Sequence, residues 1–200
     1  MSILSNEETD ILNELINIGI GRAATNFSEI LGREIMLVVP NMHIFNADQL
    51  VDYFQAKKMD DYVNVSQSFV GGLAGSGIVS FPLSDFKTLI QTLFVNHDDE
   101  VEDFGELGNE TLTEIGNVII NAVTCTISDI AGVETRSSLP VLSFSNYIIK
   151  LDDIRKEKLY LIGNGNFSVR GALIHGTVIF VILYENIRDL LNHLKNVENS

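Results

Sequence analysis

Apolar residues recur at every third or fourth position in two long stretches of the chain, which is the period of one face of an α-helix. The pattern predicts a first helix from about Asn6 to Leu31 and a second from about Phe104 to Ala131. A glycine follows each stretch, Gly32 and then Gly132, in the position typical of a C-terminal cap. The apolar stripes are Ile11, Leu12, Leu15, Ile16, Gly19, Ala23 and Ile30, and Leu112, Ile115, Gly116, Ile119, Val123, Ile127 and Ile130.

Shorter runs rich in β-branched and aromatic residues follow each long helix and predict strands. The first set covers about 35–45, 63–71 and 76–82, and the second about 141–150, 158–163 and 169–184. An amphipathic segment closes each set, 84–93 in the first and 185–194 in the second, and predicts a shorter helix. The two halves therefore have the same order of elements.

Identical residues also recur between the halves at an offset of 100 positions. We therefore expect an internal duplication with an α+β (α/β) fold. Each half has a long helix, about three strands and a shorter helix, and the halves share one mainly antiparallel sheet with helices packed on it. The chain is then a single domain, 1–200, made of two pseudo-symmetric repeats, about 1–100 and 101–200. Among the repeated residues are Leu12 and Leu112, Glu14 and Glu114, Asn17 and Asn117, Ser28 and Ser128, Ile30 and Ile130, Gly32 and Gly132, Glu34 and Glu134, and Pro40 and Pro140.

The repeated Glu and Asn lie three positions apart, on the side of each helix opposite the apolar stripe. A single Glu and Asn on an exposed helix face ordinarily contact only solvent. Substitutions at such positions cost little, within about 0.5 kcal/mol, so the positions drift, and Asn is a mediocre helix former. Because both halves nevertheless have the pair, the repetition favours a functional role.

The segment Gly19-x-Gly21-x-x-Ala24 has the spacing of a dinucleotide-binding turn but not its context. Such a turn follows a buried strand, whereas these residues lie inside a predicted helix. We expect Gly19, on the buried stripe, to let the helix approach the sheet. Gly21 lies on the outer face beyond Asn17 and is expected to leave room for a partner.

The formal net charge of −14 disfavours binding to nucleic acid or to an anionic membrane. The start of the chain lacks a secretory signal, and the longest apolar run, 178–184, is far shorter than the roughly 20 residues that span a bilayer. We therefore predict a cytoplasmic protein without membrane insertion. The lone Cys125 is expected to be a small core residue.

The histidines are scattered, and no set of His and carboxylate residues has the spacing of metal ligands. We therefore expect neither a metal nor a cofactor bound by this chain. The four histidines are His43, His97, His175 and His193.

The pattern of an acidic residue or Ser, three residues, Glu, two residues, Asn, twenty-two residues and Pro resembles that of the CheC, CheX and FliY phosphatases of bacterial and archaeal chemotaxis. Glu110 departs from the Asp or Ser of that family. The resemblance covers both long helices and is greatest to CheC, since two sites occur in one chain and we expect no further C-terminal domain like that of FliY. The matching residues are Asp10, Glu14, Asn17 and Pro40, and Glu110, Glu114, Asn117 and Pro140.

The resemblance implies a phosphatase that acts on the phospho-aspartate of a response regulator such as phosphorylated CheY. Asn17 and Asn117 would position the attacking water, and Glu14 and Glu114 would meet a lysine beside the phosphorylated aspartate. The response regulator would bind the Mg²⁺ ion. CheD, a receptor-modifying deamidase, is a further implied partner.

Two alternatives remain. The first is a non-enzymatic interaction module related to the flagellar switch protein FliM, whose middle domain resembles this fold but lacks the Glu and Asn pairs. The second is a phosphatase for a response regulator outside chemotaxis. Pro40 and Pro140 are expected to shape the exit of a strand and to have no catalytic part.

Overall fold

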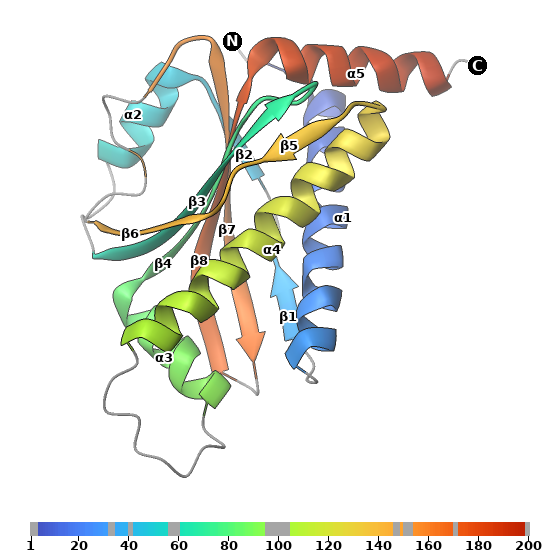
Figure 1. The fold of residues 1–200 in the computed structure, drawn as a ribbon. Helices are drawn as coiled ribbons and strands as arrows, with labels where there is room; N and C mark the ends of the chain where they lie inside the picture. The colour runs from blue at the N-terminus through green and yellow to red at the C-terminus, as the bar shows by residue number, and fades with distance from the viewer. Residues whose placement is uncertain are drawn as a thin grey trace.

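The computed structural model describes residues 4–31, 35–39, 42–55, 61–94, 105–145, 149, 154–169 and 172–198 (Figure 1). The helices are α1 (Asn6–Leu31), α2 (Ala47–Gln55), α3 (Leu83–Phe94), α4 (Gly105–Ala131) and α5 (Tyr184–Glu198). The strands are β1 (Ile35–Val38), β2 (Met42–Phe45), β3 (Tyr62–Gly71), β4 (Gly75–Pro82), β5 (Thr135–Ser137), β6 (Val141–Ser145), β7 (Lys158–Val169) and β8 (Ala172–Leu183).

All of these strands belong to one antiparallel sheet with the order β1-β7-β8-β4-β3-β5, in which β2 also pairs with β7 and β6 with β3. The order reads the same from either end if each strand is replaced by its counterpart in the other half. β4 and β8 pair at the centre, where Ile78 lies opposite Ile179. The fold class expected from the sequence is confirmed, with an antiparallel α+β architecture.

The two halves exchange their edge strands. β1 and β2, which follow α1, pair with β7 of the second half, and β5 and β6, which follow α4, pair with β3 of the first half. Ile35, for example, lies opposite Val169. The edge of each half is therefore completed by strands from the other.

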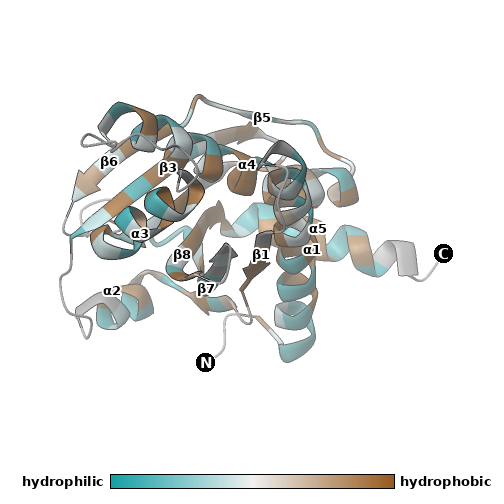
Figure 2. Ribbon diagram, turned by 90° about the horizontal axis from the view of Figure 1, so that it is seen from below, coloured by the Kyte–Doolittle hydropathy of each residue, from teal (hydrophilic) through white to brown (hydrophobic). Residues whose placement is uncertain are grey.

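The main hydrophobic core lies between one face of the sheet and the helices α1, α3, α4 and α5. Successive residues of β8 point to opposite faces of the sheet. Val178 and Phe180 belong to the main core, whereas Ile179 and Val181 pack on the other face with Leu50 of α2. Figure 2 shows apolar colour along β8 in the interior and hydrophilic colour along much of the outside of α1. The long helices thus bury one stripe and present the other to solvent.

The ends of the long helices have the capping interactions that their sequences favour. At the start of α1, the Glu8 N–H donates to the Ser5 Oγ atom at 3.1 Å, and the Ser5 N–H donates to the Glu8 Oε2 atom at 2.9 Å. Glu8 also accepts hydrogen bonds from Arg188 and Lys195 of α5. At the end of α4, Gly132 has a φ of 64° and its N–H donates to the Asp129 carbonyl oxygen, which confirms the expected cap. Gly32 and Pro40 lie outside the described residues.

Several predicted strand boundaries are wrong. The predicted strand 35–45 is two strands, β1 and β2, and the separate strands 158–163 and 169–184 are instead one long hairpin of β7 and β8. Judged from the sequence alone, the two glycines of β7, Gly163 and Gly165, are typical of a loop. Cβ atoms at Gly163 and Gly165 would come within 2.4 and 2.8 Å of Val39 side-chain atoms, so the glycines admit a close neighbour to a continuous strand. The short strand β5 was not predicted either.

The helix α2 was also missed, although the sequence contains a signal for it. The Asn46 side chain accepts from the Gln49 N–H at 2.9 Å, and the Gln49 side chain accepts from the Asn46 N–H at 3.0 Å. This reciprocal pair is a capping box, with Asn in the place of Ser or Thr. Leu50, fully buried, fixes the helix on the sheet.

Candidate functional site

The first Glu and Asn pair lies on the solvent side of α1. Glu14 and Asn17 are exposed, whereas Leu12, Leu15 and Ile16 between and beside them are buried. Within the described part of the chain, neither the Glu14 nor the Asn17 side chain has a hydrogen-bond partner. Both side chains are therefore free to contact another molecule.

A neighbouring asparagine fixes the position of α1 relative to the sheet. The Asn13 Oδ1 atom accepts a hydrogen bond of 3.0 Å from the N–H of Met42, the first residue of β2. This contact joins α1 to the start of the edge strand β2. Asn13, which accepts the hydrogen bond, is the residue directly before Glu14. The exposed pair is thus presented from a helix that is anchored both by its apolar stripe and by this bond.

The second pair, on α4, is less open. Glu114 is exposed, but Asn117 is half-buried. The Asn117 Oδ1 atom accepts from the Asn121 Nδ2 atom at 2.7 Å and from the Gln67 Nε2 atom at 3.2 Å, and Asn117 donates to the Glu114 Oε2 atom at 3.4 Å. The sequence prediction that both pairs face solvent in the same way is therefore correct for α1 and only partly correct for α4.

The orientation of the Asn117 amide follows from its neighbours. Gln67 Nε2 donates to the Ser138 carbonyl oxygen at 2.7 Å, and a carbonyl oxygen can only accept. The NH2 group of Gln67 must therefore face Ser138 and Asn117, which requires an oxygen atom of Asn117 on that side. The NH2 group of Asn117 then points to the Glu114 carboxylate, which is also an acceptor.

Gln67 and Asn121 were not among the residues chosen from the sequence. Gln67 lies on β3, far from α4 in the sequence, and is only 4% exposed. A glutamine at a buried position of a strand indicates a polar contact with another segment, because a buried polar group needs a hydrogen-bond partner. Asn121 is one helical turn beyond Asn117, and that spacing was visible in the sequence.

Gly19 has a different role from the one expected. A Cβ atom at position 19 would lie 2.5 Å from the Val123 Cα atom, so Gly19 lets α1 approach α4 and not the sheet. Gly116 is the glycine that brings a long helix to the sheet, since its Cβ would lie 2.4 Å from the Val65 Cβ atom. A Cβ atom added at Gly21 would meet no other atom within 4 Å, which agrees with the expected open space beside Asn17.

The expectation for Cys125 is wrong, because its side chain is exposed. It lies between Thr124 and Thr126, which are both buried, on the outer side of α4. Within the ranges that the structure describes, no three His, Cys, Asp or Glu side chains come together as possible metal ligands. No helix of those ranges combines the length and apolar content needed to cross a bilayer.

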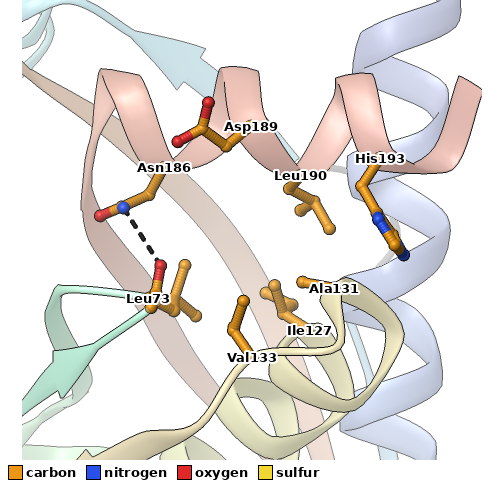
Figure 3. A pocket seen from close by; sticks show the side chains of 9 residues that line it. Leu73, Ile127, Ala131, Val133, Asn186, Asp189, Leu190 and His193 are labelled. Atoms are coloured by element: carbon orange, nitrogen blue, oxygen red, sulfur yellow. Dashed lines mark hydrogen bonds between the residues drawn. The ribbon is translucent and has the colours of Figure 1, made fainter. Parts of the chain in front are cut away.

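A pocket of about 220 Å³ lies elsewhere, between the end of α4 and α5 (Figure 3). Leu73, Ile127 and Leu190 supply apolar walls, and Asn186 donates to the Gly72 carbonyl oxygen at 3.1 Å at one side. None of the four Glu and Asn residues lines this pocket. The pocket and the repeated pairs are therefore separate features of the surface.

Comparison with known proteins agrees with the resemblance seen in the sequence. A sequence model of the CheC-like family matches residues 7–44, which include the first pair. The CheY-P phosphatase CheC of Bacillus subtilis (strain 168) is 28% identical over 146 residues, 72% of this chain and 69% of the relative. The flagellar motor switch phosphatase FliY of the same organism is 22% identical over 201 residues, 98% of this chain. The chain spans about half, 52%, of the length of that FliY.

Solved structures share the fold. FliY of Thermotoga maritima superposes with a TM-score of 0.70 at 20% identity, over 98% of this chain and 99% of the other. CheX in the CheX–CheY–BeF3–Mg²⁺ complex of Borrelia burgdorferi superposes with a TM-score of 0.53 at 19% identity, over 84% of this chain and 97% of the other. The repeated motif, the match of residues 7–44 and the relatives of known name therefore make this chain similar to the CheC-like family, and the solved structures share its fold.

Proposed function

We propose that this protein hydrolyses the aspartyl phosphate of a CheY-type response regulator in chemotaxis. The observation that carries the proposal is the recurrence of a Glu and Asn pair on two equivalent helices, with the α1 pair fully open to a partner. The name of the Bacillus subtilis relative, CheY-P phosphatase, supports the activity, and the complex of CheX with CheY supports the class of partner.

The chemistry suits an amide that is presented from a helix. An acyl phosphate is already reactive, so the catalyst mainly has to hold a water molecule in line with the phosphorus and offset charge. The water oxygen forms a bond to phosphorus, the bond to the aspartyl oxygen breaks, and the aspartate leaves as a carboxylate together with inorganic phosphate. A proton leaves the water in the same reaction, and phosphate or solvent accepts it.

Asn17 and Asn117 have the groups that this step requires. The amide carbonyl accepts from the attacking water and the amide NH2 donates, much as a Gln orients the water in GTPases. Glu14 and Glu114 are assigned to a lysine of the partner beside the phosphorylated aspartate. An exposed ion pair contributes only about 0–1 kcal/mol, so its part is to orient the partner. The partner binds the Mg²⁺ ion in this proposal.

The test is to mix the protein with a phosphorylated CheY-type response regulator in Mg²⁺ and to follow loss of the phosphoryl group. The wild type is compared with the double variant Asn17→Ala, Asn117→Ala, whose fold is checked by circular dichroism. Positioned groups of this kind contribute about a hundredfold, so we expect acceleration by the wild type and its loss in the double variant.

The choice of substrate decides between the alternatives. Acceleration with a response regulator from another signalling system, and none with a CheY-type protein, would move the activity outside chemotaxis. An absence of acceleration with every response regulator tried would favour an interaction module that binds without hydrolysis.

A further inference from the structure

The two sites differ in what surrounds the asparagine amide. Around Asn117, two donors occupy the carbonyl oxygen: Asn121 at 2.7 Å and Gln67 at 3.2 Å. A carbonyl oxygen has two lone pairs, so both acceptor positions of Asn117 are taken. The Asn17 amide has no partner among the residues that the structure describes.

Glycine stands at both corresponding places around Asn17. Gly21 occupies the helix position of Asn121, one turn beyond the asparagine. On the sheet, β7 corresponds to β3, and the strand registers, which pair Phe69 with Ser137 and Phe167 with Leu37, place Gly165 where β3 has Gln67. A Cβ atom added at Gly165 would lie 2.8 Å from the Val39 Cγ2 atom, in the segment between β1 and β2, as the Gln67 side chain contacts Ser138, between β5 and β6. The first site therefore lacks both donors.

Gln67 is held firmly in its place. It is 4% exposed, and its Nε2 atom joins the Asn117 oxygen to the Ser138 carbonyl oxygen. Ser138 is in turn fixed on β3, because its N–H donates to the Ser68 carbonyl oxygen at 2.8 Å. The Gln67 Oε1 atom is buried without a partner in the described residues, so the polar contacts of this side chain all run through Nε2. Asn117 is thus drawn toward the sheet instead of toward solvent.

We propose that Gln67 and Asn121 are positioning residues that restrain Asn117, so that the free Asn17 site turns over faster than the Asn117 site. This inference rests on the proposed function, in which the asparagine carbonyl accepts a hydrogen bond from the attacking water. For Asn117 to do so, one of its two donors must first leave. For Asn17 no contact has to break.

The kinetic test isolates each site in turn. Asn117→Ala leaves the first site and Asn17→Ala leaves the second, and we expect the first of these variants to dephosphorylate a CheY-type response regulator faster. Adding Asn121→Ala to Asn17→Ala frees one acceptor position of Asn117. Loss of one hydrogen bond of ordinary strength predicts an increase in rate of about fivefold. Gln67→Met, of similar size, is expected to act in the same direction.

A rate that falls or stays unchanged when Asn121→Ala is added would overturn the inference, because the network would then be preorganising Asn117 or be irrelevant to it. Equal rates for Asn17→Ala and Asn117→Ala would overturn it as well. Failure of the proposed function is distinct, since the wild type would then be no faster than the double variant Asn17→Ala, Asn117→Ala.

The hydrogen bonds can also be observed without any catalysis. The side-chain amide signals of Asn117 in a proton–nitrogen NMR spectrum are identified by their loss in Asn117→Ala. We expect these signals to shift in Asn121→Ala and in Gln67→Met, and the Asn17 signals to stay in place. Asn117 signals that stay in place in both variants would contradict the restraint even if the protein had no phosphatase activity.

Discussion

Gly19 of α1 faces Val123 of α4 so closely that a Cβ atom at position 19 would lie 2.5 Å from the Val123 Cα atom and 2.9 Å from its Cγ2 atom. The Val123 Cα atom belongs to the backbone, so no side-chain rotation can relieve this contact. Near this crossing, Arg22 donates to the Thr126 Oγ1 atom at 3.0 Å, so the two long helices are joined by both close packing and a hydrogen bond. Gly19 therefore sets the distance between the helices that present the two candidate sites.

Gly19→Ala is expected to destabilise the protein. The added methyl group would force α1 away from α4, and overpacking of this kind costs about 1–3 kcal/mol. Over most of this range the cost exceeds the roughly 1 kcal/mol that alanine gains over glycine inside a helix. The change in the free energy of unfolding is measured by urea denaturation, with circular dichroism as the signal.

Gly21→Ala is the matched control, because the same substitution is made in the same helix at a position with open space around it. We expect this variant to be more stable than the wild type by up to about 1 kcal/mol. Equal changes in the two variants would contradict a close helix crossing at Gly19.

Gly21→Asn tests the difference between the sites from the opposite direction. In the Asn117→Ala background it places an amide one turn beyond Asn17, as Asn121 lies beyond Asn117. The new donor should occupy the Asn17 carbonyl and lower the dephosphorylation rate by about two- to fivefold. Gly21→Ala in the same background fills the position without a donor and should leave the rate closer to that of the parent. A rate lowered equally by both substitutions would point to steric exclusion of the partner.

Glu14→Gln, also in the Asn117→Ala background, should weaken binding of the response regulator more than it slows the chemical step. An exposed ion pair contributes about 0–1 kcal/mol, which corresponds to an increase in KM of up to about fivefold with a smaller change in kcat. The salt dependence of KM should decrease, because one charged contact is lost. Glu29→Gln removes the same charge from an exposed position near the end of α1 and serves as the control. Equal effects of the two variants would leave only the net charge as the cause.

We expect the ionised carboxylate of Glu8 to stabilise the folded state at neutral pH and to lose this effect in acid. The hydrogen bond with Ser5, followed by the one from Lys195, holds the pKa of Glu8 below its usual value of 4.5. Since the folded state favours the charged carboxylate, the contribution is fully present above pH 4.5 and is lost as the pH falls through the lower folded pKa. Glu8→Gln should cost about 1 kcal/mol at pH 7, a modest figure because Arg188 and Lys195 are partly exposed.

The cost of Glu8→Gln should shrink as the pH is lowered below 4.5, which urea denaturation at several pH values can follow. Glutamine can still complete the capping box with Ser5, so the variant isolates the charge. Glu7→Gln, at the neighbouring exposed position, is expected to change stability by less than about 0.5 kcal/mol at every pH. A cost of Glu8→Gln that is independent of pH would contradict the ionic contribution.

The long helices could be predicted from the sequence because their apolar stripes repeat over many turns. The predicted first helix has the bounds observed for α1, and the predicted second begins one residue before α4. The exposure of Glu14 and Asn17 followed from the same periodicity. The binding of CheD and the catalytic parts of the Glu and Asn residues stay predictions.

The contacts between distant segments could not be read in the same way. Gly19 lies on the buried stripe, but periodicity does not say whether that stripe meets a sheet or another helix. The neighbour of Asn117 on β3, Gln67, comes from the other half of the chain, and the pairing of β3 with β5 and β6 brings Ser138 beside it. The part of the difference that comes from Gln67 therefore depends on tertiary pairing, whereas the change from Gly21 to Asn121 is visible in the sequence.

The exchange of edge strands between the halves also affects how the chain can fold. β1 and β2 leave the ribosome long before β7, on which they pair, so an N-terminal half has no partner for them during synthesis. These strands are far apart in the sequence, so a large loop must close before they can pair. The loss of chain entropy on closing that loop slows folding. A chain cut between the halves should accordingly yield two fragments that associate when mixed, and refolding of the intact chain should be slower than for a helical protein of its size.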